Sequence, residues 1–141
     1  MTALVLAVTG CSRQDQVPVR KVQIQQAWEL QPGKTVGGHP VVGGLGDISI
    51  RVGGDRVFAP FNGVLQPNDL EHCFIFSSPD VPAYLFRYCG LRHVKLGQVK
   101  QGDPIGRADY LEFAAMRRQP DGKWTMVEPA ANILERSLVS E

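Results

Sequence analysis

Two glycine-punctuated stretches decide the fold: VFAPFNGVL at residues 57–65 and LGQVKQGDPIG at residues 96–106. Both alternate short apolar runs with Gly, Asn or Pro, a pattern typical of short strands joined by sharp turns, and Asn62-Gly63 is the turn signal of the first. Further apolar runs lie at residues 73–77, 83–89, 110–117 and 124–127, with turn-forming residues at 78–80 and 120–123. We therefore predict an all-β domain.

The flanking segments are less regular. Residues 31–54 are rich in glycine and predict mainly loop, with one alternating strand at residues 47–52. Residues 17–28 predict either an edge strand or the start of a helix, and the sequence does not decide between the two. Near the other end, residues 130–138 follow Glu128-Pro129 and place Ile133, Leu134 and Leu138 on one side of a short helix.

Length and composition restrict the class of protein. The chain has 141 residues, of which 43% are hydrophobic, so it can bury a core without a metal or many disulfides, and one domain over residues 17–141 is expected. The formal net charge of +1 gives no overall attraction to nucleic acid, and we predict no nucleic-acid partner.

The first residues predict a lipid anchor. Residues 1–10 are almost entirely apolar or small and lead into the lipobox-like Val8-Thr9-Gly10-Cys11. In the lipoprotein pathway a small residue precedes a cysteine whose thiol is alkylated by diacylglycerol before cleavage. We predict a signal peptide at residues 1–10, shortened at its basic start, then lipidation of Cys11 and a tether at residues 11–16. A buried N-terminal strand is the alternative.

The same motif predicts the compartment. A lipid on Cys11 would hold the protein at a membrane of the cell envelope, on the periplasmic side, and Ser12 suits the outer membrane of a Gram-negative cell. Cys73 and Cys89 then remain, each in an apolar run. They form one disulfide in an oxidising compartment or stay as two buried thiols, and the sequence leaves both open.

The glycine framework resembles that of the LytM or lysostaphin-type zinc peptidases. Their pattern V-x-A-P-x-x-G-x-V is similar to residues 57–65, and a later pattern ending in G-x-x-I-G is similar to residues 96–106. Residues 88–91 stand at their Y-x-H-L, residues 110–114 at their H-L-H-F-E, and Glu128-Pro129 at their D-P. The resemblance covers about residues 43–135. It implies a barrel-sandwich domain with a duplicated hybrid motif, here with a short C-terminal helix.

The metal ligands of that family are largely missing from this sequence. The resembled enzymes bind Zn²⁺ through H-x-x-x-D and the second His of H-x-H. Asp47 retains the Asp, but Gly43 precedes it by four positions, Gly90 stands at the His of Y-x-H-L, and Tyr110 and Glu112 stand at H-x-H. Two carboxylates without imidazole make a poor zinc site. We predict no metal, no cofactor and no catalytic residue.

The remaining candidates for chemistry do not replace those ligands. His39, His72 and His93 have no ligand spacing and are predicted to be surface or turn residues. Cys89 has no histidine placed by the sequence to activate it, so it is not predicted to be a nucleophile. Biotinyl and lipoyl domains share the glycine framework, but their Met-Lys-Met and Asp-Lys-Ala contexts do not occur.

The predicted function is therefore binding without catalysis. A degenerate LytM-like domain would keep a groove formed by Asp47, Tyr88, Tyr110 and Glu112, flanked by residues 33–54 and the loop at 92–95, that binds peptidoglycan or an envelope protein. The alternative is that Tyr110 and Glu112 bind no ligand and only fill the space that the metal occupies in the resembled enzymes. One rival is a lipoyl-like barrel-sandwich adaptor in an envelope assembly, which predicts a flat surface. The other is a divergent metallopeptidase, which predicts that Asp47, Glu112 and His39 converge.

Overall fold

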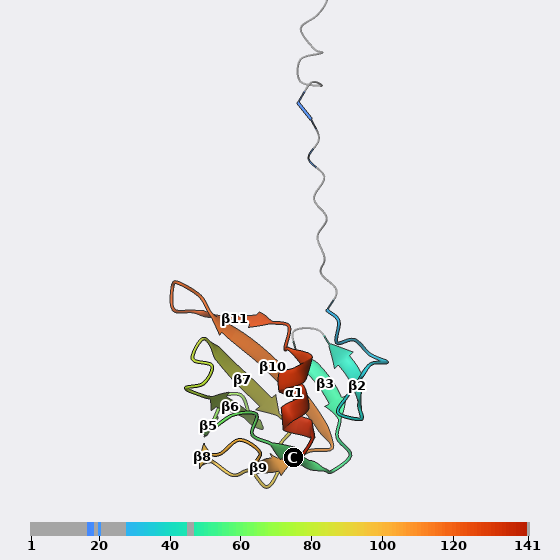
Figure 1. Cartoon of the computed structure of the whole chain (residues 1–141), viewed down its shortest axis with the longest axis vertical. Coiled ribbons are helices and arrows are strands. Elements are labelled where there is room, and N and C mark those ends of the chain that lie inside the picture. The colour runs from blue at the N-terminus through green and yellow to red at the C-terminus, as the bar shows by residue number, and fades with distance from the viewer. Residues whose placement is uncertain (1–16, 19, 21–27, 45–46, 141) are drawn as a thin grey trace, which may run out of the picture.

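The structure, a computed structural model, describes residues 17–18, 20, 28–44 and 47–140 (Figure 1). In this part of the chain there are eleven strands and one C-terminal helix, so the all-β prediction with a short helix is confirmed. The signal peptide, Cys11, the tether and most of residues 17–28 lie outside the described residues. In the segments described, no helix combines the length and the apolar character needed to cross a membrane.

The strands form two sheets. The larger has the order β1-β2-β3-β10-β7-β6-β5-β8, with β11 paired to β10, and the smaller consists of β4 and β9. Every strand pair is antiparallel. The elements are β1 Thr35–Val36, β2 His39–Gly44, β3 Ile48–Arg51, β4 Arg56–Phe58, β5 Gly63–Pro67, β6 Cys73–Ser77, β7 Tyr84–Cys89, β8 Gly97–Val99, β9 Pro104–Arg107, β10 Tyr110–Arg118, β11 Trp124–Val127 and α1 Ala131–Leu138.

The two glycine-punctuated stretches pair with each other across both sheets. The first supplies β4 and β5, the second supplies β8 and β9, and β4 pairs with β9 while β5 pairs with β8. Where the two stretches pass from one sheet to the other, the carbonyl of Ala59 accepts a hydrogen bond from the amide of Gly102 at 2.9 Å. The amide of Ala59 donates one to the carbonyl of Asp103 at 2.9 Å. The chain bends at residues 60–62, beside the turn signal Asn62-Gly63, and this bend leads from β4 in the smaller sheet to β5 in the larger one.

The turns predicted at residues 78–80 and 120–123 are confirmed, and side-chain hydrogen bonds stabilise both. Between β6 and β7 the Ser78 hydroxyl accepts from the amide of Asp80 at 3.1 Å and donates to the carbonyl of Asn62 at 2.6 Å. Between β10 and β11, Asp121 accepts from the amide of Lys123 at 2.9 Å. Figure 1 shows the β10–β11 hairpin extending beyond the rest of the sheet.

The prediction that residues 31–54 form mainly loop is wrong. Strands β1 and β2 pair with each other and β2 continues the main sheet beside β3, with a register shift between Val41 and Gly43. Val36 and Val41 are buried in the core, so the strands are stabilised by packing although their sequence does not alternate. Gly37 and Gly38 adopt positive φ of 54° and 79° in the turn between β1 and β2.

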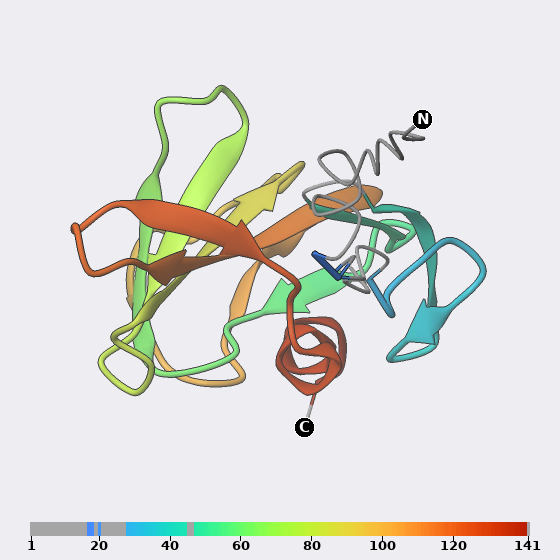
Figure 2. The ribbon, with the colours of Figure 1, turned by 90° about the horizontal axis from the view of Figure 1, so that it is seen from above.

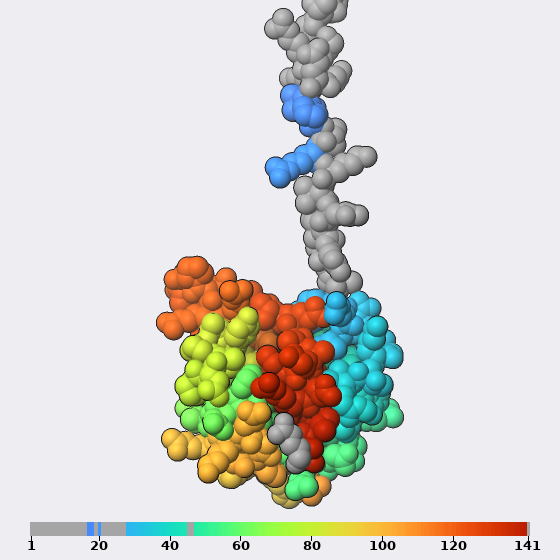
Figure 3. All heavy atoms as spheres, viewed as in Figure 1, coloured from blue at the N-terminus to red at the C-terminus, as the bar shows by residue number. Residues whose placement is uncertain are grey.

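Helix α1 covers one face of the core. It contacts β4 and β1, and it buries Leu134 and Leu138 as the apolar spacing predicted. Figure 2 shows the helix nearly end-on, outside the sheets, and Figure 3 shows it in the middle of one face of the molecule. Beneath it the largest buried side chains are mostly aromatic or aliphatic, among them Tyr88, Phe76, Phe86, Phe113, Ile48, Ile50, Leu65, Ile105 and Leu111.

Candidate functional site

Strand β10 carries two of the four predicted groove residues on its surface. Tyr110 is paired in register with Arg51 of β3, and Glu112 is paired with Ser49 of β3 and Cys89 of β7. Residues two apart in a strand share a face, so Tyr110 and Glu112 project from the same side of the main sheet. Both are exposed, Tyr110 by 53%. We call this side the outer face.

Asp47 and Tyr88, the other two predicted groove residues, are less exposed than Tyr110 and Glu112. Asp47 directly precedes β3 and is half-buried. Tyr88 is fully buried, with its hydroxyl 2.6 Å from that of Ser137 in α1, and its ring packs edge-on against Phe113, with the ring centroids 5.0 Å apart. The prediction that Tyr88 lines a groove is therefore wrong, because Tyr88 is paired with Phe113 on the side of the sheet that faces the core.

An arginine lies over the exposed tyrosine. The guanidinium carbon of Arg51 is 5.7 Å from the centre of the Tyr110 ring, which is within the range of a cation–π contact. The outer face thus presents an aromatic ring with a cation on it, beside the Glu112 carboxylate. Sequence reasoning did not single out Arg51. Its alternation with Ser49 indicated that both share a face, but not that β3 would pair with β10.

A disulfide borders the same surface. Cys73 of β6 and Cys89 of β7 face each other in register and are bonded, with their Cα atoms 4.1 Å apart. The sequence had left this bond and two free thiols open. Since Cys89 is also paired with Glu112, the disulfide continues the row of side chains across the sheet. A bonded Cys89 has no thiol that could act as a nucleophile.

Two glycines stand at positions where the resembled peptidases have histidine, Gly43 at a zinc ligand and Gly90 at the His of Y-x-H-L. Their side chains offer no donor atom, and Gly90 has a φ of 91°, with the carbonyl oxygen of Tyr110 too close to the position that a Cβ would take. A histidine could not be accommodated there without moving the backbone. Within residues 28–44 and 47–140, no three His, Cys, Asp or Glu side chains lie together as metal ligands. Asp47 and Glu112 thus have no imidazole partner among the described residues.

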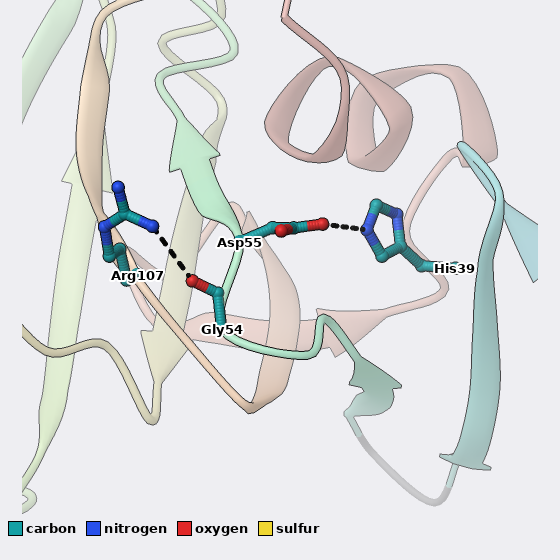
Figure 4. Close-up of polar contacts among 4 residues, drawn as sticks. All are labelled: His39, Gly54, Asp55 and Arg107. Carbon is teal, nitrogen blue, oxygen red and sulfur yellow. Dashed lines mark hydrogen bonds and ion pairs between the residues drawn. The ribbon is translucent and has the colours of Figure 1, made fainter.

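The three histidines lie elsewhere. His39 begins β2, and its Nε2 is 3.5 Å from the Asp55 carboxylate (Figure 4). Among the described residues it does not form a group of possible metal ligands with Asp47 and Glu112. The convergence expected of a divergent metallopeptidase therefore does not occur. His72 and His93 adopt positive φ of 61° and 53°, as residues of tight turns do.

Three hollows of the surface lie away from Tyr110 and Glu112. The largest, about 660 Å³, is lined by Asn62, Gly63, Val64, Pro79, Lys95, Gln98, Val99, Lys100 and Asp103. The others, of about 250 and 540 Å³, lie beside β4 and β9 and at the β10–β11 hairpin. None of these three is lined by Tyr110, Glu112 or Arg51, which lie on the exposed surface of the main sheet.

Comparisons with known proteins give a partial likeness to a solved structure. No protein-family model matches the chain, and no curated protein matches it. Among solved structures, it is similar to one described as the NMR solution structure of lysostaphin, with 21% sequence identity and a TM-score of 0.44. The likeness covers 55% of this chain and 38% of that one, so the matched part spans well under half of that protein's length.

Proposed function

We propose that this chain is a non-catalytic binding module of the bacterial cell envelope whose outer face holds a strand of peptidoglycan. One observation carries the proposal: exposed Tyr110, with the Arg51 guanidinium over its ring, lies on the same face of β10 as exposed Glu112. These are the two positions at which the resembled peptidases have the histidines of H-x-H.

The chemistry of these side chains suits a sugar–peptide polymer. A tyrosine ring offers an apolar face to the flat side of a sugar and a hydroxyl for hydrogen bonding. Arg51 supplies several donors and Glu112 supplies acceptors, so hydroxyls and amides of a ligand find both kinds of partner. An open sheet surface also accommodates an extended polymer better than a closed pocket, which suits a small molecule.

The proposal includes the place of the protein in the cell, at a membrane of the envelope. The lipobox at residues 8–11 supports attachment through a lipid on Cys11, facing the periplasm, and at the outer membrane in a Gram-negative cell. The Cys73–Cys89 disulfide supports an oxidising compartment. Tethered there, the domain lies within reach of the cell wall.

The first test is a pull-down of residues 12–141 on purified peptidoglycan sacculi, with zinc determined on the same sample. We expect binding without stoichiometric zinc. Absence of binding would overturn the wall-binding proposal and direct the search to a protein partner. Stoichiometric zinc together with release of wall fragments would overturn the non-catalytic proposal.

Variants of the outer face make the test specific. Tyr110→Ala and Glu112→Gln should each weaken binding about tenfold, the change expected when a contact worth about 1.4 kcal/mol is lost. Leu96→Ala and Glu71→Gln are the matched controls, because both residues are exposed and lie on loops outside the outer face. Equal loss in the controls would show that the effect is not located on the outer face.

A further inference from the structure

The small sheet places two arginines directly opposite each other. Arg56 of β4 is paired in register with Arg107 of β9, and an isolated bridge pairs Arg107 with Arg92 on its other side. Directly opposed side chains in antiparallel strands lie within contact distance, and like charges there destabilise the pair. A negative charge between them would therefore stabilise this arrangement.

Within residues 28–44 and 47–140, Arg92 is the one of these three arginines that has a carboxylate partner. The Arg92 guanidinium donates to the carboxylate of Asp109, 2.5 Å away. Arg107 donates to the backbone carbonyl of Gly54 at 3.2 Å, and the guanidinium carbon of Arg56 lies 5.6 Å from the centre of the Phe58 ring. Among the described residues, neither Arg56 nor Arg107 has a carboxylate within ion-pair distance.

The nearest acid is directed away from them. Asp55 directly precedes Arg56 in the sequence, but Figure 4 shows its carboxylate pointing toward His39 and away from Arg107. Its Oδ2 lies 3.5 Å from Nε2 of His39. The interaction with His39 therefore keeps the Asp55 carboxylate from neutralising Arg107, and within the part of the chain that the structure describes Arg56 and Arg107 have no ion-pair partner.

These cations border a hollow. A pocket of about 250 Å³ is lined by Asp55, Arg56, Phe58, Arg107, Leu138 and Ser140. Its polar wall comes from the arginines and the end of α1, and its apolar wall comes from Phe58 and Leu138, which are themselves almost fully buried. The volume suits a single anionic group with a short substituent, not a polymer.

We propose that this pocket is an anion site in which Arg56 and Arg107 bind a carboxylate or phosphate group of a ligand. A guanidinium presents a planar fork of donors that matches the oxygens of either group, and Arg107 uses one of its five donors on Gly54. Binding would convert the cross-strand repulsion into two charge-assisted contacts. The site is separate from the outer face and does not depend on the proposed wall binding.

The test is a titration of the ¹⁵N-labelled domain, followed by amide chemical shifts at low salt. The probes are inorganic phosphate and N-acetylalanine, in separate experiments. We expect saturable shifts at residues 54–58 and 107 with a Kd of about 1 mM for at least one probe. A preference for phosphate would indicate a phosphorylated ligand, and a preference for N-acetylalanine would indicate a peptide carboxylate.

Two substitutions locate the effect. Arg56→Gln and Arg107→Gln should each raise the Kd about tenfold, whereas Lys123→Gln, which removes an exposed charge on the β10–β11 hairpin, should leave it unchanged. Both arginine substitutions remove a repulsion, so the remaining spectrum should show an intact fold. The proposal is overturned if neither probe gives a saturable shift up to about 50 mM, or if the affinity is unchanged in both arginine variants.

Discussion

The phenolic oxygen of Tyr88 lies 2.6 Å from the hydroxyl oxygen of Ser137, and both side chains are fully buried. The pair joins β7 to α1 across 49 positions of the sequence. Sliding or rotating the helix would leave two buried hydroxyls without a partner, which costs free energy for each. The bond therefore fixes how α1 packs on the sheet.

Removing either hydroxyl should destabilise the domain, but unequally. Ser137→Ala leaves the Tyr88 hydroxyl buried and unpaired, and we expect the free energy of unfolding to fall by about 1–3 kcal/mol. Tyr88→Phe should cost less, because a helical serine can turn its hydroxyl to a backbone carbonyl of the preceding turn. Urea denaturation of both variants and of the double variant checks this. A larger loss for Tyr88→Phe would contradict the expected order.

Tyr88 should also make stability depend on alkaline pH. Burial raises the pKa of its phenol above the ordinary value of 10.0, and the hydrogen bond from Ser137 lowers it by less. Above about pH 10 the unfolded chain loses this proton and the folded chain keeps it, so the unfolded state binds fewer protons. Stability should then fall with rising pH by about 1.4 kcal/mol per unit from this residue alone.

Comparison with Tyr88→Phe isolates that contribution. All other ionisable groups are common to both proteins, so the quantity to measure is the difference in unfolding free energy between the parent and Tyr88→Phe from pH 8 to pH 11. We expect a constant difference below about pH 10 and a decline above it. A difference that stays constant over the whole range would show that Tyr88 ionises equally in both states.

Much of the fold could be predicted from local patterns, because its hairpins and helix depend on neighbouring residues. The turns after Ser77 and after Arg118 and the apolar side of α1 are of this kind. Strand β2 could not be predicted, since its glycines hide any alternation and its pairing with β3 includes a register shift. The pairing of β4 with β9 joins segments far apart in the sequence, which no local pattern reports.

The sequence predicted the exposure of some of the candidate residues and not of others. Tyr110 and Glu112 share an exposed face, as their spacing in one strand requires. Tyr88 was misplaced, although the sequence held the relevant signal: Tyr88 alternates in phase with Phe86, and Arg87 lies on the opposite side. The opposed pair of Arg56 and Arg107 was missed, because only the tertiary pairing brings the two together.

The disulfide should contribute substantially to stability. The Cys73–Cys89 bond closes a loop with a sequence separation of 16, and the chain-entropy model gives about 3 kcal/mol for a loop of this size. The double variant Cys73→Ala/Cys89→Ala should therefore have a lower free energy of unfolding, by up to about that amount, measured by urea denaturation. Addition of a thiol reductant should lower the stability of the parent protein and leave that of the variant unchanged. Equal stability of the oxidised parent and the variant would contradict this.

Replacing one of the two opposed arginines should raise the stability of the domain and weaken its binding of the anion. At low ionic strength, replacing Arg56 by Thr removes the repulsion with Arg107, which is worth about 0.2–1 kcal/mol, and places a β-branched residue in a strand. The lost contact with Phe58 offsets part of this gain. Added NaCl screens the repulsion, so it should raise the stability of the parent relative to Arg56→Thr.

Phosphate should raise the stability of the parent relative to that of Arg56→Thr, because the parent keeps both arginines of the proposed site. A ligand that binds only the folded state adds RT ln(1 + [L]/Kd) to its stability, so phosphate at ten times its Kd should stabilise the parent by about 1.4 kcal/mol. Arg56→Thr should gain little, and Arg118→Thr, whose strand partner is Trp124, should gain as much as the parent. The comparison is made by thermal unfolding at constant ionic strength, with NaCl replacing phosphate in the control. Equal stabilisation of all three proteins would mean that phosphate acts through the solvent and not through Arg56.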